Sequence, residues 1–296
     1  VAIPEFNTRF TRGMLMDTMP KDFNTLVRLS GFSHGTDVWL GNARELIVSG
    51  TASVLETVGC RDDIMLYLIS MGLDPKMSFK IMEAVRKGKV KKGGFQEGWE
   101  EAMRDHEVPD WYIGSLAKIG YLFPKAHAVA YVMMAFRIAW FKVHEPLAFY
   151  ATFFSIRAKA FDAEYCCAGL DAVKQKIKEI ENNKDATDVE QNLMVTLEVC
   201  YEFYLRGFHF DTIDIYKSDA TRFKITENGL LPPFVTVRGL GETAALDTVE
   251  KRKGKSFISV EEFANTCSKL SKTHIEQLKA LGAFAGMADT SQVSLF

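Results

Sequence analysis

The sequence lacks the cysteine and histidine patterns of disulfide-stabilised and metal-binding proteins. Its five cysteines form an odd set with no C-x-x-C pair, which argues for a reducing compartment and against a cysteine zinc site. None of the six histidines stands in H-E-x-x-H or another ligand spacing. We therefore expect neither a disulfide framework nor a metal ion held by this chain.

Several catalytic motifs are missing as well. The sequence contains no P-loop, no G-x-G-x-x-G after a strand and no D-x-D pair of carboxylates. The stretch "SGFSHGTDVWLGNA" contains Ser33, His34 and Asp37, the residue types of a hydrolase triad. It has no G-x-S-x-G turn, however, and His34 directly follows Ser33, a spacing that rarely lets the two side chains meet. We interpret this stretch as a polar loop near a substrate.

The sequence also lacks a strong net charge and a long apolar run. Its formal net charge is −2, so any affinity for nucleic acid must come from local basic clusters. No signal peptide opens the chain, and the most apolar run, Ala128 to Phe136, is about half as long as a bilayer span requires. We expect a soluble, cytoplasmic protein with no membrane partner. The first residue, Val1, indicates processing or a piece of a longer chain.

What the sequence does contain is helical periodicity, which predicts a mainly α fold. Asp74 followed by Pro75 predicts the start of a helix that Gly88 ends. A long helical region is expected from about Ala126 to Ala158, bent or interrupted near Pro146.

The composition changes farther along the chain. From Leu193 to Val237, the residues favour strands and turns, and "ENG" marks a hairpin, which predicts a small β-containing insert. Two short helical repeats, "VRGLGETAALDTVEKR" and "LSKTHIEQLKALGAF", then precede a tail that ends in "ADTSQVSLF".

The first of these repeats has the pattern of a helix-hairpin-helix element. Its turn, Val237 to Gly241, opens a helix whose first amides are free, and glycines let a phosphate approach the backbone without a Cβ in the way. Such an element grips a nucleic-acid backbone without reading its sequence. The residues concerned are Arg238, Gly239, Leu240 and Gly241. A glycine-rich helix entry without function is an equally good interpretation of this motif alone.

A basic run and an aromatic stretch offer further phosphate-binding candidates. The run comprises Arg86, Lys87, Lys89, Lys91 and Lys92. It follows a helix C-terminus, where cations suit the helix dipole, so a solvated basic loop is the simpler interpretation. The interleaved glycines nevertheless predict a flexible polycationic loop suited to phosphates.

In "YLFPKAH", Pro124 sets the first turn of the long helix and places Lys125 and His127 inside that turn. Positive groups there oppose the helix dipole, a cost that an anion bound at the site would offset. Tyr121 and Phe123 could offer aromatic faces to a base or sugar. Aromatic packing beside an exposed lysine is the alternative interpretation.

These stretches together resemble one family. "SGFSHGTDVWLGNA", "CRDDIMLYLISMGLDPKMSFKIMEAVRKGK", "WYIGSLAKIGYLFPKAHAVAYVMMAFRIAWFKVHEPLAFYATFFS" and "SQVSLF" are similar to the C-terminal part of the PolC-type DNA polymerase III alpha subunit, the replicative polymerase of low-GC Gram-positive bacteria. The resemblance covers essentially the whole chain.

The resemblance implies an architecture. Residues 1–160 would be the polymerase fingers, 161–192 a connecting helix, 193–285 a tandem helix-hairpin-helix domain with a small β insert, and 286–296 a flexible tail. The tail's last five residues match the clamp-binding pattern Q-x-x-L-F, in which a glutamine anchors by hydrogen bonds and two apolar side chains fill a pocket. These residues are Gln292, Val293, Ser294, Leu295 and Phe296.

The resemblance also implies roles for the candidate residues. Tyr121 would lie against the base or sugar of the incoming dNTP, with Lys125 and His127 toward its triphosphate. The remaining candidates for the dNTP are Arg86, Lys87 and Lys89, with Arg61, Ser33 and His34 as weaker ones. Lys91 and Lys92 would join the helix-hairpin-helix turn in contacting DNA. Other implied partners are primer-template DNA, the beta sliding clamp, other replisome subunits, and the palm and thumb of the same polymerase.

Catalysis in this family depends on two Mg²⁺ ions held by palm aspartates. The palm would precede Val1, so we expect no catalytic residue and no bound Mg²⁺ in this chain, and no nucleotidyl transfer by the chain alone. The alternative is a stand-alone, clamp-associated DNA-binding module without chemistry. The "YLFPKAH" constellation favours the polymerase, because a pure binding module has no use for it.

Overall fold

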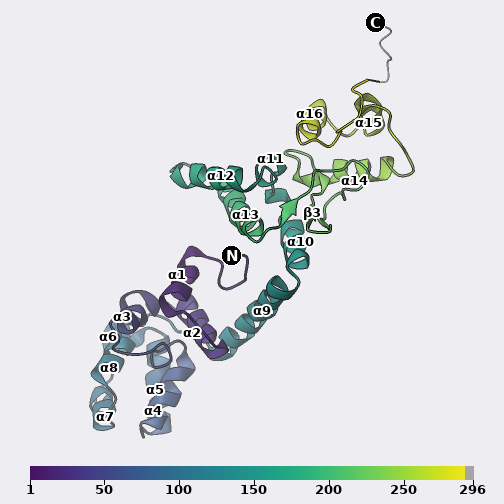
Figure 1. The fold of residues 1–296 in the computed structure, drawn as a ribbon. Coiled ribbons are helices and arrows are strands. Elements are labelled where there is room, and N and C mark those ends of the chain that lie inside the picture. Colours follow the sequence, from purple (N-terminus) through teal and green to yellow (C-terminus); the bar gives the residue numbers. More distant parts are fainter. Residues whose placement is uncertain (291–296) are drawn as a thin grey trace. The chain divides into compact units, whose positions relative to one another are not determined.

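The computed structural model describes residues 1–290, and the chain divides into two compact units (Figure 1). One unit comprises Ile3–Ala139, and the other comprises Val1–Ala2 together with Trp140–Phe296. The division lies inside helix α9 (Lys125–His144), whereas the predicted end of the fingers lies near residue 160. The roles assigned above to residue ranges remain predictions.

The unit of residues 3–139 is helical and has one continuous core. Buried side chains of successive helices form this core, among them Phe32, Ile64, Ile81, Leu116 and Val132. Its elements are α1 (Arg9–Thr18), α2 (Phe23–His34), a π-type turn (Trp39–Ala43), α3 (Arg44–Val48), α4 (Arg61–Ser70), α5 (Pro75–Arg86), α6 (Lys89–Gly93), α7 (Trp99–Asp105), α8 (Asp110–Lys118) and the first part of α9.

Helix α5 begins and ends as its sequence predicts. Asp74 is the N-cap, and its carboxylate accepts the backbone N–H of Met77 at 2.8 Å, with Pro75 in the first helical position. Gly88, with φ of 65°, follows the last turn in a left-handed conformation that suits glycine. One face of the helix, spaced at three to four residues, is buried against the core.

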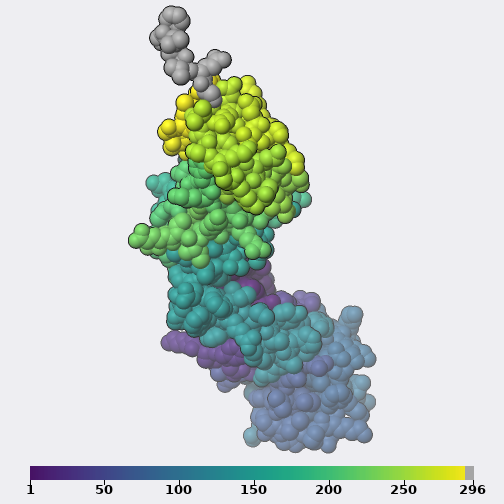
Figure 2. Space-filling view, turned by 90° about the vertical axis from the view of Figure 1, so that its right-hand side faces the viewer, coloured from purple at the N-terminus to yellow at the C-terminus, as the bar shows by residue number. Residues whose placement is uncertain are grey.

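The unit that contains residues 140–290 combines helices with a small sheet. The elements of this unit are α10 (Pro146–Ile156), a 3₁₀ turn (Ala158–Ala160), α11 (Ala163–Cys166), α12 (Leu170–Asn182), α13 (Asp188–Leu205), β1 (His209–Phe210), β2 (Lys224–Ile225), β3 (Gly229–Leu231), a 3₁₀ turn (Phe234–Thr236), α14 (Glu242–Lys251), α15 (Val260–Thr266) and α16 (Lys272–Ala280). The strand order in the sheet is β1–β3–β2, with β1 parallel and β2 antiparallel to β3. In Figure 2, residues from about 240 to 290 form one continuous packed body.

The predicted β insert is partly right. The "ENG" hairpin is confirmed, since it joins β2 to β3 with Ile225 opposite Leu230. The strand prediction is wrong for Leu193–Leu205, which belong to α13, and for Phe234–Thr236, which form a 3₁₀ turn. The mainly α class is confirmed.

Two features explain why α13 forms despite its β-branched and aromatic composition. Thr187 and Glu190 make a capping box, in which the Glu190 carboxylate accepts the Thr187 N–H at 2.9 Å. Leu193, Leu197 and Cys200 recur at helical spacing and are buried. The helix therefore packs its apolar stripe into the core of its unit, which overrides strand propensity.

The long helical region is interrupted as predicted, since α9 ends at His144 and α10 begins with Pro146. By length and mean hydropathy of 1.2, α9 alone among the described helices could cross a bilayer. One such helix is weak evidence for a membrane protein, because helices of soluble proteins meet the same criterion. Several apolar side chains of α9 are exposed to solvent.

Candidate functional site

A short backbone segment, Gly120 to Phe123, holds the first unit's candidate residues together. Thr36 donates its N–H to the Tyr121 carbonyl at 2.9 Å, and Gly120 donates its N–H to the Thr36 carbonyl at 2.9 Å. The Leu122 N–H reaches the Arg86 carbonyl at 3.3 Å. The polar loop and the basic run therefore meet the start of "YLFPKAH".

Two further contacts complete this junction. The Arg61 N–H donates to the Phe123 carbonyl at 3.3 Å. Gly88 lies so close to Gly120 that a Cβ at position 88 would be 2.5 Å from the Gly120 carbonyl oxygen. Three stretches that are distant in sequence, around residues 36, 61 and 87, thus contact the backbone of Gly120–Phe123.

The aromatic side chains of this junction form a small stack. His34 and Phe123 have ring centroids 4.8 Å apart and nearly parallel planes. His127 meets the edge of Phe123 at 5.7 Å. The Tyr121 side chain is 41% exposed, so its ring is accessible to a ligand.

Ser33 and His34 belong to the last turn of α2, not to the polar loop that the sequence predicted, and both have partners inside the chain. His34 Nε2 lies 2.6 Å from Glu5 Oε2, and the Ser33 hydroxyl donates to the Ser30 carbonyl at 3.0 Å. The loop that follows them carries Thr36, which is hydrogen-bonded to the junction. Neither contact makes Ser33 a nucleophile, which agrees with the rejection of the hydrolase interpretation.

Lys125 and His127 do lie in the first turn of α9, but Lys125 faces carboxylates of the chain itself. Asp62 Oδ2 accepts the backbone N–H of Lys125 at 2.9 Å, and Asp63 Oδ1 lies 3.6 Å from Lys125 Nζ. Sequence reasoning missed both carboxylates, although they stand next to Arg61 in "CRDD". They offset part of the unfavourable dipole interaction that had pointed to a bound anion.

Arg86 and Lys87 share one carboxylate, Glu83. Arg86 Nη2 lies 3.0 Å and Lys87 Nζ 2.7 Å from Glu83 Oε2. Hydrogen bonds from Arg86 and then from Lys87 lower the pKa of Glu83 to about 2. Glu83 is a second site residue that the sequence did not reveal, although its i,i+3 and i,i+4 spacing is a recognisable signal.

The rest of the basic run is not the flexible loop that its glycines predicted. Lys89, Lys91 and Lys92 belong to the short helix α6. Lys91 Nζ lies 2.6 Å from Asp37 Oδ2. Lys89 and Lys92 are exposed, and no carboxylate among residues 1–290 pairs with either. These two lysines are the most available cations of the run.

In the second unit, the predicted helix-hairpin-helix turn forms. Gly241 is the N-cap of α14 and has no side-chain cap, so amides of the first turn point outward. Gly239 has φ of 77°, and a Cβ there would lie 3.7 Å from Nε2 of His274 in the first turn of α16. Leu240 is buried and anchors the turn. The turn of α14 therefore lies beside the start of a second helix.

Arg238 is not free to meet a phosphate. Its Nε and Nη2 donate to Asp162 Oδ2 at 2.8 and 2.7 Å, and Nη2 also lies 3.2 Å from Glu164 Oε2. The guanidinium packs over the Tyr165 ring at 5.2 Å. Phosphate binding by Arg238 requires that it exchange these carboxylates for the ligand.

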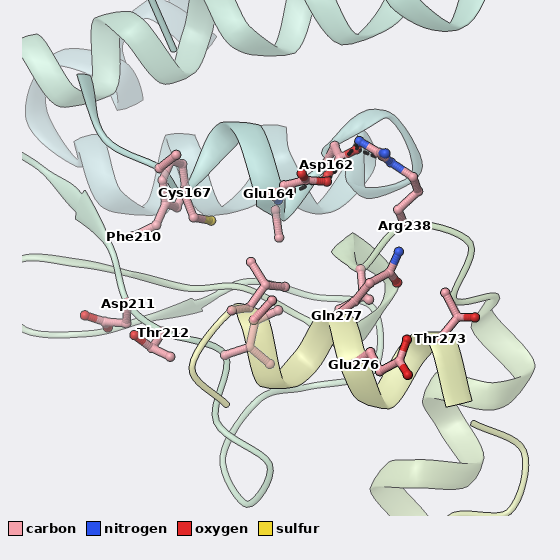
Figure 3. A pocket seen from close by; sticks show the side chains of 16 residues that line it. Asp162, Glu164, Cys167, Phe210, Asp211, Thr212, Arg238, Thr273, Glu276 and Gln277 are labelled. Atoms are coloured by element: carbon pink, nitrogen blue, oxygen red, sulfur yellow. Dashed lines mark hydrogen bonds and ion pairs between the residues drawn. The ribbon is translucent and has the colours of Figure 1, made fainter. Parts of the chain in front are cut away.

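The same ion pairs border a cavity of about 560 Å³ (Figure 3). Carboxylates of Asp162, Glu164, Asp211 and Glu276 line it, together with apolar side chains of β1 and α16. Arg238 is the one cation in this lining. The acidic lining disfavours a phosphate, so we do not place a nucleotide in this cavity.

Comparison with known proteins places both units. The model of the bacterial DNA polymerase III alpha subunit finger domain matches residues 1–107, and the model of the helix-hairpin-helix motif matches residues 207–293. Three curated relatives, each a PolC-type DNA polymerase III, match the whole chain. They come from Caldanaerobacter subterraneus subsp. tengcongensis (53% identity), Halalkalibacterium halodurans (50%) and Bacillus cereus (52%).

The chain belongs to the PolC-type DNA polymerase III family. It spans 20–21% of the length of these relatives. The PolC-type likeness thus covers both the junction around residue 121 and the turn around residue 240.

The structure bears differently on three expected PolC-type features: the tail, the metal ligands and the cysteines. The residues predicted to bind the clamp, Gln292, Val293, Ser294, Leu295 and Phe296, lie outside the described residues. Among residues 1–290, no group of three or more histidine, cysteine, aspartate or glutamate side chains could hold a metal ion. The five cysteines are free thiols, and burial raises the pKa of Cys60, beside the junction, to about 12.

Glu83 gives a pH-dependent test of this PolC-type site. Because its pKa is depressed from 4.5 to about 2, its contribution to stability is complete above about pH 4.5 and is lost as pH falls through 2. We expect Glu83→Gln to lower the free energy of unfolding by about 0.5–1 kcal/mol at pH 7, as for two helical surface pairs. Denaturant titrations from pH 2 to 7 should show this difference shrinking toward zero at acid pH. A pH-independent difference would contradict the ion-pair assignment.

Proposed function

We propose that this chain is part of a replicative DNA polymerase that carries out template-directed synthesis from dNTPs. Its first unit binds the incoming dNTP, its helix-hairpin-helix region grips duplex DNA, and its tail binds the sliding clamp. The observation that carries the proposal is the convergence of the basic run, Arg61 and "YLFPKAH" on the backbone of Gly120–Phe123. Full-length relatives named as polymerases support it.

The dNTP assignment follows from the positions of cations and rings in the junction. Lys125 and His127 lie at the N-terminus of the 20-residue helix α9, where backbone dipoles favour a triphosphate. Tyr121, whose side chain is exposed in the same junction, offers a face to the base or sugar. Further contacts are expected from Arg86, Lys87 and Lys89, and weaker ones from Arg61, Ser33 and His34. A triphosphate carries more charge than a carboxylate, so it can displace Glu83 as the partner of Arg86 and Lys87.

The duplex-binding assignment rests on the outward amides of α14. Gly241 leaves these donors uncovered, and an extended backbone with no Cβ permits close approach of a phosphate. Contacts of this kind are independent of base sequence. Lys91 and Lys92, in the other unit, are proposed to add phosphate contacts.

The metal chemistry of the proposed polymerase is expected to come from outside this chain. Palm aspartates that precede it would hold the two Mg²⁺ ions. The residues here would position the nucleotide and neutralise its charge, which is necessary and insufficient for transfer. We therefore expect the chain alone to be inactive.

The exposed apolar side chains of α9 fit a role as one part of a larger enzyme. Tyr131, Met133, Met134 and Phe136 are each 44–55% exposed in the first unit. Four large apolar side chains exposed on one helix are suited to burial against another domain. We propose that the palm and thumb of the polymerase cover it. Other replisome subunits and a cytoplasmic location follow from the proposed function.

The alternative is a stand-alone, clamp-associated DNA-binding module. It predicts duplex binding without dNTP binding, whereas the polymerase assignment predicts both. Measuring dNTP binding to this chain, with and without palm and thumb, separates the two. A dNTP affinity that never appears, even with palm and thumb present, would favour the binding module.

Lys125 gives the sharpest test of the dNTP site. Lys125→Ala, in a PolC-type polymerase that carries this segment, should lower kcat/KM for dNTP while DNA affinity stays unchanged. A charge-assisted phosphate contact is worth ~1.5–3 kcal/mol, so we expect a loss of roughly ten- to hundredfold. Lys80→Ala, at an exposed lysine of α5, is the matched control. A change within about twofold for Lys125→Ala would remove this residue from the triphosphate site.

Gly241 tests the duplex grip without disturbing the fold. Its φ is −72°, and a Cβ there would meet no atom within 4 Å, so Gly241→Val should keep the fold and lower the unfolding temperature only slightly, because valine is a poorer N-cap than glycine. The branched side chain should weaken binding to all duplexes equally, and wild-type binding should fall steeply with salt. Glu250→Gln, at the far end of α14, is the control. Sequence-dependent losses, or binding that high salt leaves unchanged, would contradict a phosphate-only contact.

The tail has its own test in the full-length polymerase. Changing Leu295 and Phe296 to Ala should abolish clamp-stimulated processive synthesis and leave clamp-independent synthesis near its normal rate. Two buried apolar side chains are worth ~1.5–3 kcal/mol each before ordering costs, so the expected affinity is modest. Val293→Ala with Ser294→Ala, at the variable positions of the motif, is the matched control. Joint loss of thermal stability and unassisted activity in the Leu295/Phe296 variant would argue against clamp binding.

A further inference from the structure

The two carboxylates of "CRDD" lie at the start of α4 and differ in their surroundings. The Asp63 side chain is 9% exposed, and its Oδ2 accepts the N–H groups of Gly59 at 3.1 Å and Cys60 at 3.0 Å. Arg28 Nη1 donates to the same oxygen at 3.2 Å. Three donors thus fix one carboxylate oxygen, and the orientation of the whole carboxylate with it.

The other oxygen of Asp63 faces the proposed dNTP site. Oδ1 lies 3.6 Å from Lys125 Nζ, on a different helix. The ammonium has three N–H donors, so it can keep this carboxylate while it meets a phosphate oxygen. Asp63 therefore limits the positions that the flexible lysine side chain can take.

Asp62 acts on the backbone of the same residue. Its Oδ2 accepts the Lys125 N–H at 2.9 Å and so satisfies one of the free donors at the start of α9. The carboxylate comes from α4, which means that it also ties the first turn of α9 to α4. Both the main chain and the side chain of Lys125 are thus held by neighbouring residues of one helix.

We propose that Asp62 and Asp63 are positioning residues for dNTP binding, acting through Lys125. Asp62 fixes the first turn of α9, and Asp63 holds the ammonium where the triphosphate arrives. A pre-positioned lysine loses less side-chain entropy when the nucleotide binds, so the effect appears mainly in KM for dNTP. This inference rests on the proposed function and assigns residues that touch Lys125 rather than the nucleotide.

A double-mutant cycle in the full-length polymerase tests the part played by Asp63. Asp63→Asn should raise KM for dNTP about three- to tenfold when Lys125 is present and less than about twofold in a Lys125→Ala background. Equal effects in both backgrounds would mean that Asp63 only supports the fold, through Arg28 and the 59–60 backbone. Glu100→Gln, which removes an exposed carboxylate beside Arg104 in α7, is the control and should change neither KM nor kcat.

Asp62 provides a second test that does not depend on the folding of the Asp63 variant. Its side chain is 36% exposed, so its replacement should be tolerated by the fold. Asp62→Ala should raise KM for dNTP, and Asp62→Asn, which retains an acceptor oxygen, should restore it to within about twofold. An alanine variant with unchanged KM, or an asparagine variant as impaired as alanine, would overturn the capping role. If Lys125→Ala alone leaves dNTP use unchanged, the proposed dNTP site has failed; if Lys125→Ala is impaired but neither aspartate behaves as stated, only this inference has failed.

Discussion

The backbone of Gly120–Phe123 is the constraint on which the candidate site depends. Thr36 bonds to it from the polar loop, the Arg86 carbonyl accepts from it, and the Arg61 N–H donates to it. Main-chain hydrogen bonds of this kind are insensitive to side-chain identity, so they set positions and leave the exposed side chains to determine chemistry. Gly88 and Gly120 permit the closest of these approaches, because a Cβ at either position would overlap neighbouring atoms. Larger residues at either glycine would separate the basic run from "YLFPKAH".

Charge pairing gives this junction a definite geometry before any ligand binds. Glu83 holds Arg86 and Lys87, Asp37 holds Lys91, and Asp63 faces Lys125. These partners reduce the local excess of positive charge. The whole chain likewise has nearly balanced charges, with a formal net charge of −2. A phosphate ligand must compete with Glu83 and Asp37, so binding is weaker than a count of cations would indicate but more selective for several negative charges.

How far the sequence predicts this structure can be seen in particular elements. The cap at Asp74 and the glycine at position 88 bound α5 correctly, because both signals act through local backbone geometry. Composition misleads for α13, where buried spacing and the Thr187–Glu190 capping box outweigh the strand propensity of single residues. The partners of the site cations were not predictable in the same way. Asp63 and Lys125 are 62 residues apart, and only the packed fold brings α4 against the start of α9.

Asp62 and Asp63 of α4, which contact the start of α9, weaken the case for a bound anion there but do not remove it. The sequence indicated that positive groups at Lys125 and His127 carry a cost that a bound anion would offset, yet Asp62 and Asp63 already supply negative charge beside Lys125. Asp62 lowers the cost by capping a backbone donor, and Asp63 does so by facing the ammonium. A helix that needed only a stable first turn would achieve it with a carboxylate and no lysine. The lysine beside two carboxylates is therefore an added charge that the stability of α9 does not explain, and the same junction carries the exposed ring of Tyr121. Cation and ring together are what a nucleotide requires, whereas helix formation explains neither.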